Sequence, residues 1–143
     1  MELETTESGW ACNERGVAYA VNQQYDRAIA DFDQAIRLTP HYSHFYNNRG
    51  IAFTEKGQYD RAIQDFDQAI RLTPNFAVPF QNRGRAFRMK GQKAQADADF
   101  TKAGQLNPNV PPPLSMFLNL RLRAWLSQLS LHRLATQTLK LDR

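Results

Sequence analysis

The sequence lacks the features that define several common classes of protein. Its single cysteine cannot form a disulfide within the chain, so the fold depends on packing alone. No run of residues approaches the ~18 uncharged apolar residues that a membrane-spanning helix needs. The acidic first eight residues contain no apolar segment, which argues against a secretory signal. We therefore expect a cytoplasmic protein.

Residues suited to catalysis or metal binding are also scarce. The three histidines are His41, His44 and His132, and they do not combine with Cys12 at the spacing of a zinc site. The seven glycines form no phosphate-binding loop, and no Ser/His/Asp or Cys/His grouping occurs in a supporting context. We expect that the chain is not an enzyme and binds no metal or cofactor.

Excess positive charge is confined to one end of the chain. The formal net charge is +4. Residues 111–143 contain five basic side chains and one acidic side chain, whereas residues 1–110 contain 13 of each. Because the larger part of the chain is neutral, we do not expect nucleic acid as a partner.

What the sequence does contain is a 34-residue repeat. Residues 25–40 read YDRAIADFDQAIRLTP and residues 59–74 read YDRAIQDFDQAIRLTP, so one position of sixteen differs. A third, more divergent copy follows at the same offset. A period of this length is typical of stacked helical units. The positions that recur are Gly16, Gly50 and Gly84; Tyr19, Phe53 and Phe87; Ala28, Ala62 and Ala96; Phe32, Phe66 and Phe100; Ala35, Ala69 and Ala103; and Pro40, Pro74 and Pro108.

Each copy predicts two helices joined by a turn. In the second copy, Ala62, Phe66 and Ala69 fall on one helical face. Residues 56–58 form the turn, and Pro74 ends the unit because proline cannot continue a helix. The recurring glycine of the first helix allows close approach, and the large Phe66 fills the space between hairpins. Each hairpin leaves an apolar face uncovered, so hairpins must stack.

The period and these residues resemble the tetratricopeptide repeat (TPR) family over residues 9–108. The resemblance implies an all-α solenoid of antiparallel helix pairs, wound into a right-handed superhelix and closed by a C-terminal capping helix. It also implies a scaffold or module for protein–protein interaction. The expected segments are an N-terminal extension (1–8), three repeats (9–42, 43–76 and 77–110) and a tail (111–143).

One position departs from the family pattern. The family usually has a leucine-like residue before the recurring glycine, whereas this chain has Arg15, Arg49 and Arg83. An arginine stem can pack while its guanidinium group reaches a partner. The two interpretations are a structural ladder, in which each arginine pairs with an aspartate of the adjoining helix, and direct contact with a ligand. The repetition favours the ladder.

The second helix of each copy carries closely spaced aspartates. We interpret them as a solvated helix face, because a calcium loop needs a glycine bend and further ligands. The spacing also predicts ion pairs from Asp33 to Arg37 and from Asp67 to Arg71. The aspartate pairs are Asp31 and Asp33, Asp65 and Asp67, and Asp97 and Asp99.

The resemblance also indicates a binding site. In the family, the first helix of each repeat lines a concave groove that holds a peptide, and an extended peptide or a partner helix is the expected occupant here. A carboxamide both donates and accepts hydrogen bonds, so it can pair with a peptide backbone without reading its sequence. The alternatives are solvated amides or caps of the inter-repeat loops. The residues expected to bind the ligand are Asn13, Asn47, Asn48, Gln81, Asn82 and Arg85, with Asn48 and Asn82 leading.

Charge should divide this groove into two parts. Arg85 and Arg88 make the third-repeat end basic, and Glu14 and Glu55 make the other part acidic. This distribution favours a ligand of mixed charge, with an acidic segment near the two arginines.

Some TPR domains clamp the C-terminal carboxylate of heat-shock chaperones with lysine, asparagine and arginine. Asn48 matches the middle asparagine, but the other matching places hold Asn13, Val17, Val78 and Asn82. Because a carboxylate would have no charged partner there, we do not expect this mode of binding.

The tail opens with Pro111-Pro112-Pro113 and continues with an apolar stripe at helical spacing. A helix that caps the last hairpin is the simplest interpretation. Attachment to an anionic membrane or acidic surface, and homodimerisation, are the alternative functions of this basic segment. A third interpretation is that the tail is not an evolved part of the fold. The stripe consists of Leu118, Leu122, Trp125, Leu126 and Leu129.

Overall fold

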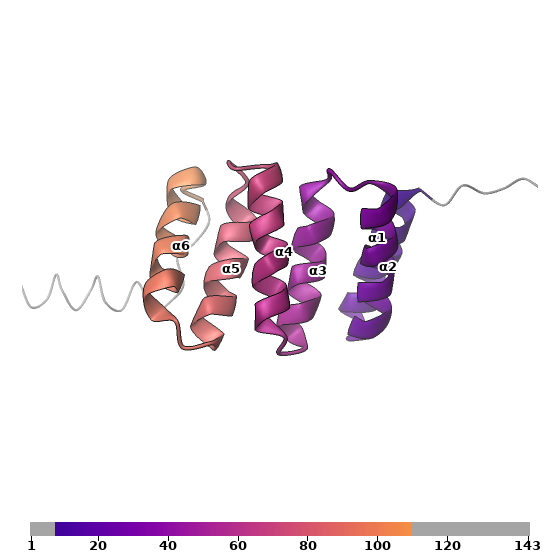
Figure 1. Cartoon of the computed structure of the whole chain (residues 1–143), viewed down its shortest axis with the longest axis horizontal. Helices are drawn as coiled ribbons and strands as arrows, with labels where there is room; N and C mark the ends of the chain where they lie inside the picture. Colours follow the sequence, from indigo (N-terminus) through magenta and orange to yellow (C-terminus); the bar gives the residue numbers. More distant parts are fainter. Residues whose placement is uncertain (1–7, 110–143) are drawn as a thin grey trace, which may run out of the picture. The chain divides into compact units, whose positions relative to one another are not determined.

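The computed structural model describes residues 8–109, which form six helices and no strand within this range. Consecutive helices pair into three hairpins that stand side by side in chain order (Figure 1). The all-α solenoid that the sequence predicts is therefore present. The expected capping helix falls in residues 111–143, outside the described range. The helices are α1 (Gly9–Val21), α2 (Tyr25–Leu38), α3 (Ser43–Glu55), α4 (Tyr59–Leu72), α5 (Ala77–Met89) and α6 (Lys93–Leu106).

The turn inside each hairpin passes through one residue with positive φ. These residues are Gln23 at 60°, Gly57 at 73° and Gly91 at 78°. Glycine adopts this conformation without steric cost, so the predicted turn at residues 56–58 is confirmed. Gln23 adopts the same left-handed conformation with a side chain, which costs free energy.

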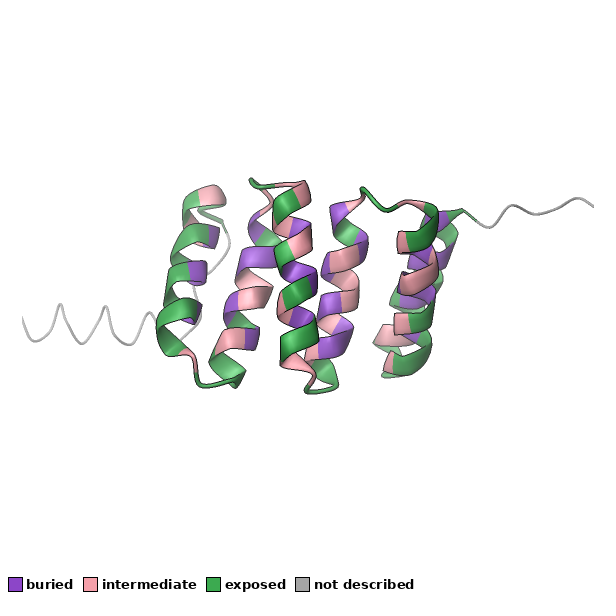
Figure 2. Cartoon of the chain, viewed as in Figure 1, coloured by how far each residue is buried: buried purple, intermediate pink, exposed green. Residues whose placement is uncertain are grey.

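The core of each hairpin is a phenylalanine of the second helix packed on a glycine of the first. An added Cβ at Gly50 would lie 2.7 Å from the Phe66 ring, which shows how closely the two helices approach. The buried positions recur on the facing sides of successive helices (Figure 2). They include Ala28, Phe32, Ala35, Ala62, Phe66, Ala69, Ala96, Phe100 and Ala103.

Neighbouring hairpins share parts of this core. Phe53, Ala62 and Phe66 of the second hairpin cluster with Ala86 of the third. Phe66 therefore fills the space between hairpins, as the sequence predicts, and packs on Gly50 of its own hairpin as well. Because each hairpin completes the apolar core of the next, the hairpins stabilise one another.

The six helices form two layers. The first helices α1, α3 and α5 contact one another in turn, whereas α2, α4 and α6 do not contact one another. An array in which one layer is closer packed than the other must curve towards the closer layer. We call α1, α3 and α5 the inner helices, and α2, α4 and α6 the outer helices.

Candidate functional site

A chain of asparagine side chains links the three inner helices. Asn48 of α3 donates from Nδ2 to Oδ1 of Asn13 in α1, at 2.9 Å. Asn82 of α5 donates from Nδ2 to Oδ1 of Asn47 in α3, at 3.0 Å. Within α3, Asn47 Nδ2 and Asn48 Oδ1 are 3.5 Å apart. We call these four residues the amide ladder, and it fixes the orientation of each carboxamide.

The members of the amide ladder differ in exposure. Asn13 and Asn47 are buried, with relative exposures of 9% and 4%. Asn48, Asn82 and the neighbouring Gln81 are half-buried. Since a carboxamide can make four hydrogen bonds, the half-buried members keep donors and acceptors that the ladder does not use. The sequence predicted these positions as candidate ligand-binding residues, but it did not predict the hydrogen bonds among them.

The inner helices also carry exposed aliphatic side chains beside the ladder. Residues three, four and seven apart share one helical face, so Val17 of α1 lies on the side that carries Asn13. Its relative exposure is 41%, and those of Val78 and Met89 in α5 are 37% and 59%. The inner surface therefore combines amides between the helices with exposed aliphatic side chains.

The two charged parts expected along this surface are joined in the structure. Arg85 Nη2 of α5 lies 3.2 Å from Glu55 Oε1 of α3. The guanidinium of Arg88 lies over the Phe100 ring, 5.2 Å from its centroid. The expectation of a separate basic end was therefore wrong for Arg85, because neighbouring inner helices bring its side chain to that of Glu55.

The three arginines before the recurring glycines form the predicted structural ladder. Arg49 donates from Nε and Nη2 to the two carboxylate oxygens of Asp65, at 2.8 and 2.6 Å. Its Nη1 donates to Asp33 of the preceding hairpin at 2.6 Å. Arg83 repeats this geometry with Asp99 and Asp67, and Arg15 binds Asp31 through Nε and Nη2. Each rung that bridges two hairpins holds the array together.

Two expectations about the aspartates were wrong for part of the set. Asp67 and Asp97 are exposed, as expected. Asp31, Asp65 and Asp99 are buried rather than solvated, with relative exposures of 9%, 5% and 6%. Asp33 binds Arg49 of the next hairpin, whereas Arg37 donates to Gln34 rather than to Asp33. The guanidinium groups of the arginine ladder reach the aspartates from other helices, and spacing within one helix does not reveal this.

Burial changes the acid–base properties of the middle rung. It raises the pKa of the Asp65 carboxyl above its ordinary value, more than the hydrogen bonds from Arg49 lower it. The hydrogen bonding that Arg49 donates to Asp65 is the largest of the effects that raise the pKa of Arg49. Arg49 therefore stays charged and compensates a carboxylate that burial disfavours.

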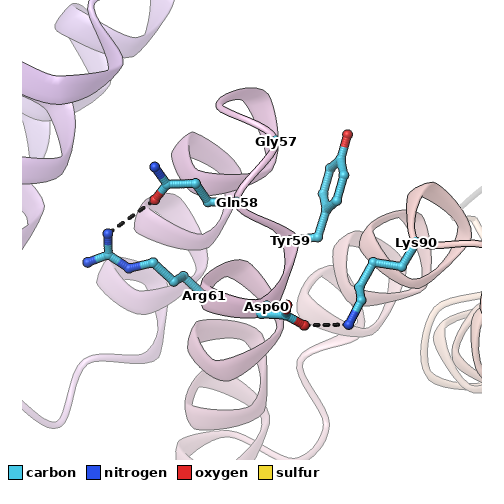
Figure 3. Close-up of a pocket in the computed structure, with 6 residues that line it drawn as sticks. All are labelled: Gly57, Gln58, Tyr59, Asp60, Arg61 and Lys90. Carbon is cyan, nitrogen blue, oxygen red and sulfur yellow. Dashed lines mark hydrogen bonds and ion pairs between the residues drawn. The ribbon is translucent and has the colours of Figure 1, made fainter.

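A second row of ion pairs lies on the turn side of the hairpins. Lys90 binds Asp60 of the preceding hairpin, and Lys56 binds Asp26 in the same way. Figure 3 shows Asp60 and Lys90 at one side of a shallow pocket, with Gln58 accepting a hydrogen bond from Arg61 at the other. Because these charged groups already have partners, we assign the pocket a stabilising role.

Sequence reasoning missed a group of aromatic side chains at the beginnings of the inner helices. The Trp10 ring packs at a tilt against Tyr42, whereas Tyr42 stacks on His44 and His44 stacks on Phe76. Two alternating sets at the 34-residue offset contribute to it, Trp10 with His44 and Tyr42 with Phe76. The 34-residue offset could have indicated this group in the sequence, but neither set repeats the same residue type from copy to copy.

Between residues 8 and 109, no three side chains of His, Cys, Asp or Glu lie close enough together to hold a metal ion. In the same range, no helix is both long and apolar enough to cross a membrane.

Comparison with known proteins finds a family model that matches part of the chain. Residues 13–75 match the family model described as tetratricopeptide repeat. No curated protein sequence matches the chain.

Solved structures match over most of the chain. The TPR domain of OM64 from Arabidopsis is 28% identical, with a TM-score of 0.69, over 71% of this chain and 84% of that domain. The second TPR domain of Spaghetti (RPAP3), bound to the HSP90 peptide SRMEEVD, is 26% identical, with a TM-score of 0.68 and coverage of 71% and 94%. MamA is 28% identical, with a TM-score of 0.68, over 73% of this chain and 57% of MamA.

Proposed function

We propose that this chain, an all-α protein built of tetratricopeptide repeats, is a protein-interaction module that binds an extended segment of another protein. The segment lies across the inner helices α1, α3 and α5. Asn48 and Asn82 bind its backbone, Gln81 and Arg85 contact it beside them, and the buried Asn13 and Asn47 hold the two leading amides in place.

The amide ladder is the observation that carries this proposal. It places Asn48 and Asn82 in fixed orientations, and both retain hydrogen-bonding groups on a surface that solvent reaches. A backbone that forms no hydrogen bonds of its own offers donors and acceptors in equal number, which is what carboxamides can match. The backbone of a partner helix is already hydrogen-bonded internally, so an extended segment suits the amides better.

Helix spacing sets the length of the segment. Helices in direct contact lie ~8–10 Å apart, and an extended chain advances ~3.3 Å per residue. About three residues therefore pass each inner helix, so a segment of about seven to nine residues crosses all three.

The ligand differs in chemistry from the peptide bound to the second TPR domain of Spaghetti. That peptide, SRMEEVD, ends in an aspartate and has two glutamates before its last valine. At the matching places this chain has Asn13, Val17, Val78 and Asn82, which carry no positive charge. We therefore propose that recognition does not depend on a C-terminal carboxylate.

Affinity capture from a native lysate tests the proposal. We expect proteins retained by the unmodified chain to be lost with Asn48→Ala/Asn82→Ala. The matched control is Gln64→Ala/Gln95→Ala, which removes two exposed amides from the outer helices α4 and α6. Partners held equally by the wild type and the Asn48→Ala/Asn82→Ala variant would rule out recognition by the amides.

Charge reversal tests the role of Arg85 in ligand binding. Its pair with Glu55 is exposed and weak, so an acidic residue of the ligand can replace Glu55. We expect Arg85→Glu to weaken capture and Glu14→Lys to leave it unchanged. The reverse result would contradict an acidic residue near Arg85.

A further inference from the structure

The aromatic residues Trp10, Tyr42, His44 and Phe76 form a continuous row along the beginnings of α1, α3 and α5. The ring centroids are 4.3 Å apart from Trp10 to Tyr42, 4.9 Å from Tyr42 to His44 and 4.4 Å from His44 to Phe76. Trp10 is 49% exposed and His44 is also exposed. We call these four residues the aromatic row.

The aromatic row borders the amide ladder. Trp10 precedes Asn13 by three residues, and His44 precedes Asn47 by three. Residues three apart in a helix share a face, so the row and the ladder lie about one helical turn apart on the inner helices. A segment bound along the ladder therefore passes the row.

The row offers apolar rings and unused hydrogen-bond donors. Among the described residues, the indole N–H of Trp10 and the hydroxyl of Tyr42 donate to no other group. None of the four side chains is a carboxylate, so the row has no anion that would attract a basic segment. Its chemistry suits a ligand with apolar rings and free carbonyl oxygens.

Stacking within the row argues against flat ligands. Tyr42 and His44 are stacked with an interplanar angle of 21°, and His44 and Phe76 with 28°. Each imidazole or phenyl face that touches a neighbour is unavailable to a nucleobase, which binds by stacking on an open face. Compact aliphatic rings can pack on the exposed edges instead.

We propose that the aromatic row recognises proline residues of a partner segment in the polyproline II conformation, and this inference rests on the proposed function of the inner helices. Such a segment has no internal hydrogen bonds and its prolines have no N–H, so its carbonyl groups need donors. It advances ~9.3 Å in three residues, close to the ~8–10 Å between contacting helices. Every third residue therefore meets the next repeat.

Fluorescence polarisation of a labelled ten-residue oligoproline peptide, titrated with the full chain, tests this proposal. We expect Trp10→Ala to weaken binding about tenfold, because a large apolar anchor is removed. We expect Trp10→Phe to weaken it about fivefold, because the ring stays and one donor is lost. The control Gln64→Ala changes an exposed residue of the outer helix α4 and should have no effect.

The outcomes separate this inference from the proposed function. Absence of oligoproline binding, or equal binding by the wild type and both Trp10 variants, overturns the role of the row. If Asn48→Ala/Asn82→Ala still abolishes partner capture in that case, the function of the amides stands. If instead the Trp10 variants lose oligoproline binding while the asparagine variant captures its partners normally, the row is a site and the amides are not. Circular dichroism of each variant verifies that the fold is intact.

Discussion

The first two hairpins contain nearly the same second helix, yet the arginine bound to that helix is held differently. Residues 25–40 and 59–74 differ at one position of sixteen. The Arg15 side chain, paired with Asp31, is 50% exposed, whereas the Arg49 side chain, paired with Asp65, is 21% exposed. Arg49 also binds Asp33 of the preceding hairpin. In the second hairpin, the arginine therefore also links its own hairpin to the preceding one.

The largest expected effect follows from removing the arginine of the second hairpin. Arg49→Met leaves the buried Asp65 without its partner and should lower the free energy of unfolding by about 3 kcal/mol. Arg15→Met, at the more exposed rung, should lower it by about 1 kcal/mol after allowance for solvent screening. Urea denaturation of both variants measures the difference. Equal losses would show that bridging two hairpins adds nothing.

The next largest loss of stability should come from adding a methyl group at the recurring glycine. It should be equal in the first two hairpins, because the clash arises within each hairpin. An added Cβ would lie 2.8 Å from the Phe32 ring at Gly16 and 2.7 Å from the Phe66 ring at Gly50. Both rings are buried and cannot move away cheaply. We expect Gly16→Ala and Gly50→Ala each to cost about 2 kcal/mol. A thermal melt that finds one of them neutral would show that its hairpin relaxes.

The stability of Arg49→Met should depend on pH. Without Arg49, only the smaller Coulombic effect of Arg61 offsets the burial that raises the pKa of Asp65, so the folded state binds a proton more readily than the unfolded state. Stability then rises as pH falls through the folded-state pKa towards the unfolded value, by about 1 kcal/mol per pH unit. Urea denaturation from pH 7 downwards should show the gap to wild type narrowing. A gap that widens on acidification would mean that Asp65 keeps a low pKa by another interaction.

The smallest effect concerns the turns of the first two hairpins. Gln23 and Gly57 occupy equivalent positions with φ of 60° and 73°. Gln23→Gly should stabilise the protein by up to about 1 kcal/mol, and Gly57→Gln should destabilise it by a similar amount. Chemical denaturation should show opposite shifts of the midpoint. Shifts of the same sign would mean that side-chain contacts, rather than backbone conformation, decide this position.

Sequence reasoning predicted the features that depend on local rules. The turn around Gly57, the helix ends before Pro40 and Pro74, and the packing of Phe66 follow from backbone chemistry and helical periodicity. The pairing of Arg49 with an aspartate of the adjoining helix was also predicted, because a regular repeat gives every copy the same neighbour. Repetition thus made some long-range contacts predictable.

Contacts that cross between hairpins were predicted less well. The link from Arg49 to Asp33 replaced an expected pair within one helix, and the pair of Arg85 with Glu55 replaced two separate charged regions. Both depend on how the helices of neighbouring hairpins approach one another, which no spacing along the chain specifies. Whether Asn48 and Asn82 contact a ligand remains a proposal, since their known partners are other asparagines.

The most direct test of the account asks which layer of helices touches a partner. A photoreactive benzoylphenylalanine replaces Val17 or Arg85 on the inner helices, or Gln64 on the outer helix α4, and each full-length variant is irradiated in a native lysate. We predict that one partner cross-links from both inner positions and not from Gln64. Cross-linking from Gln64 alone would place recognition on the outer helices and contradict binding along the amide ladder.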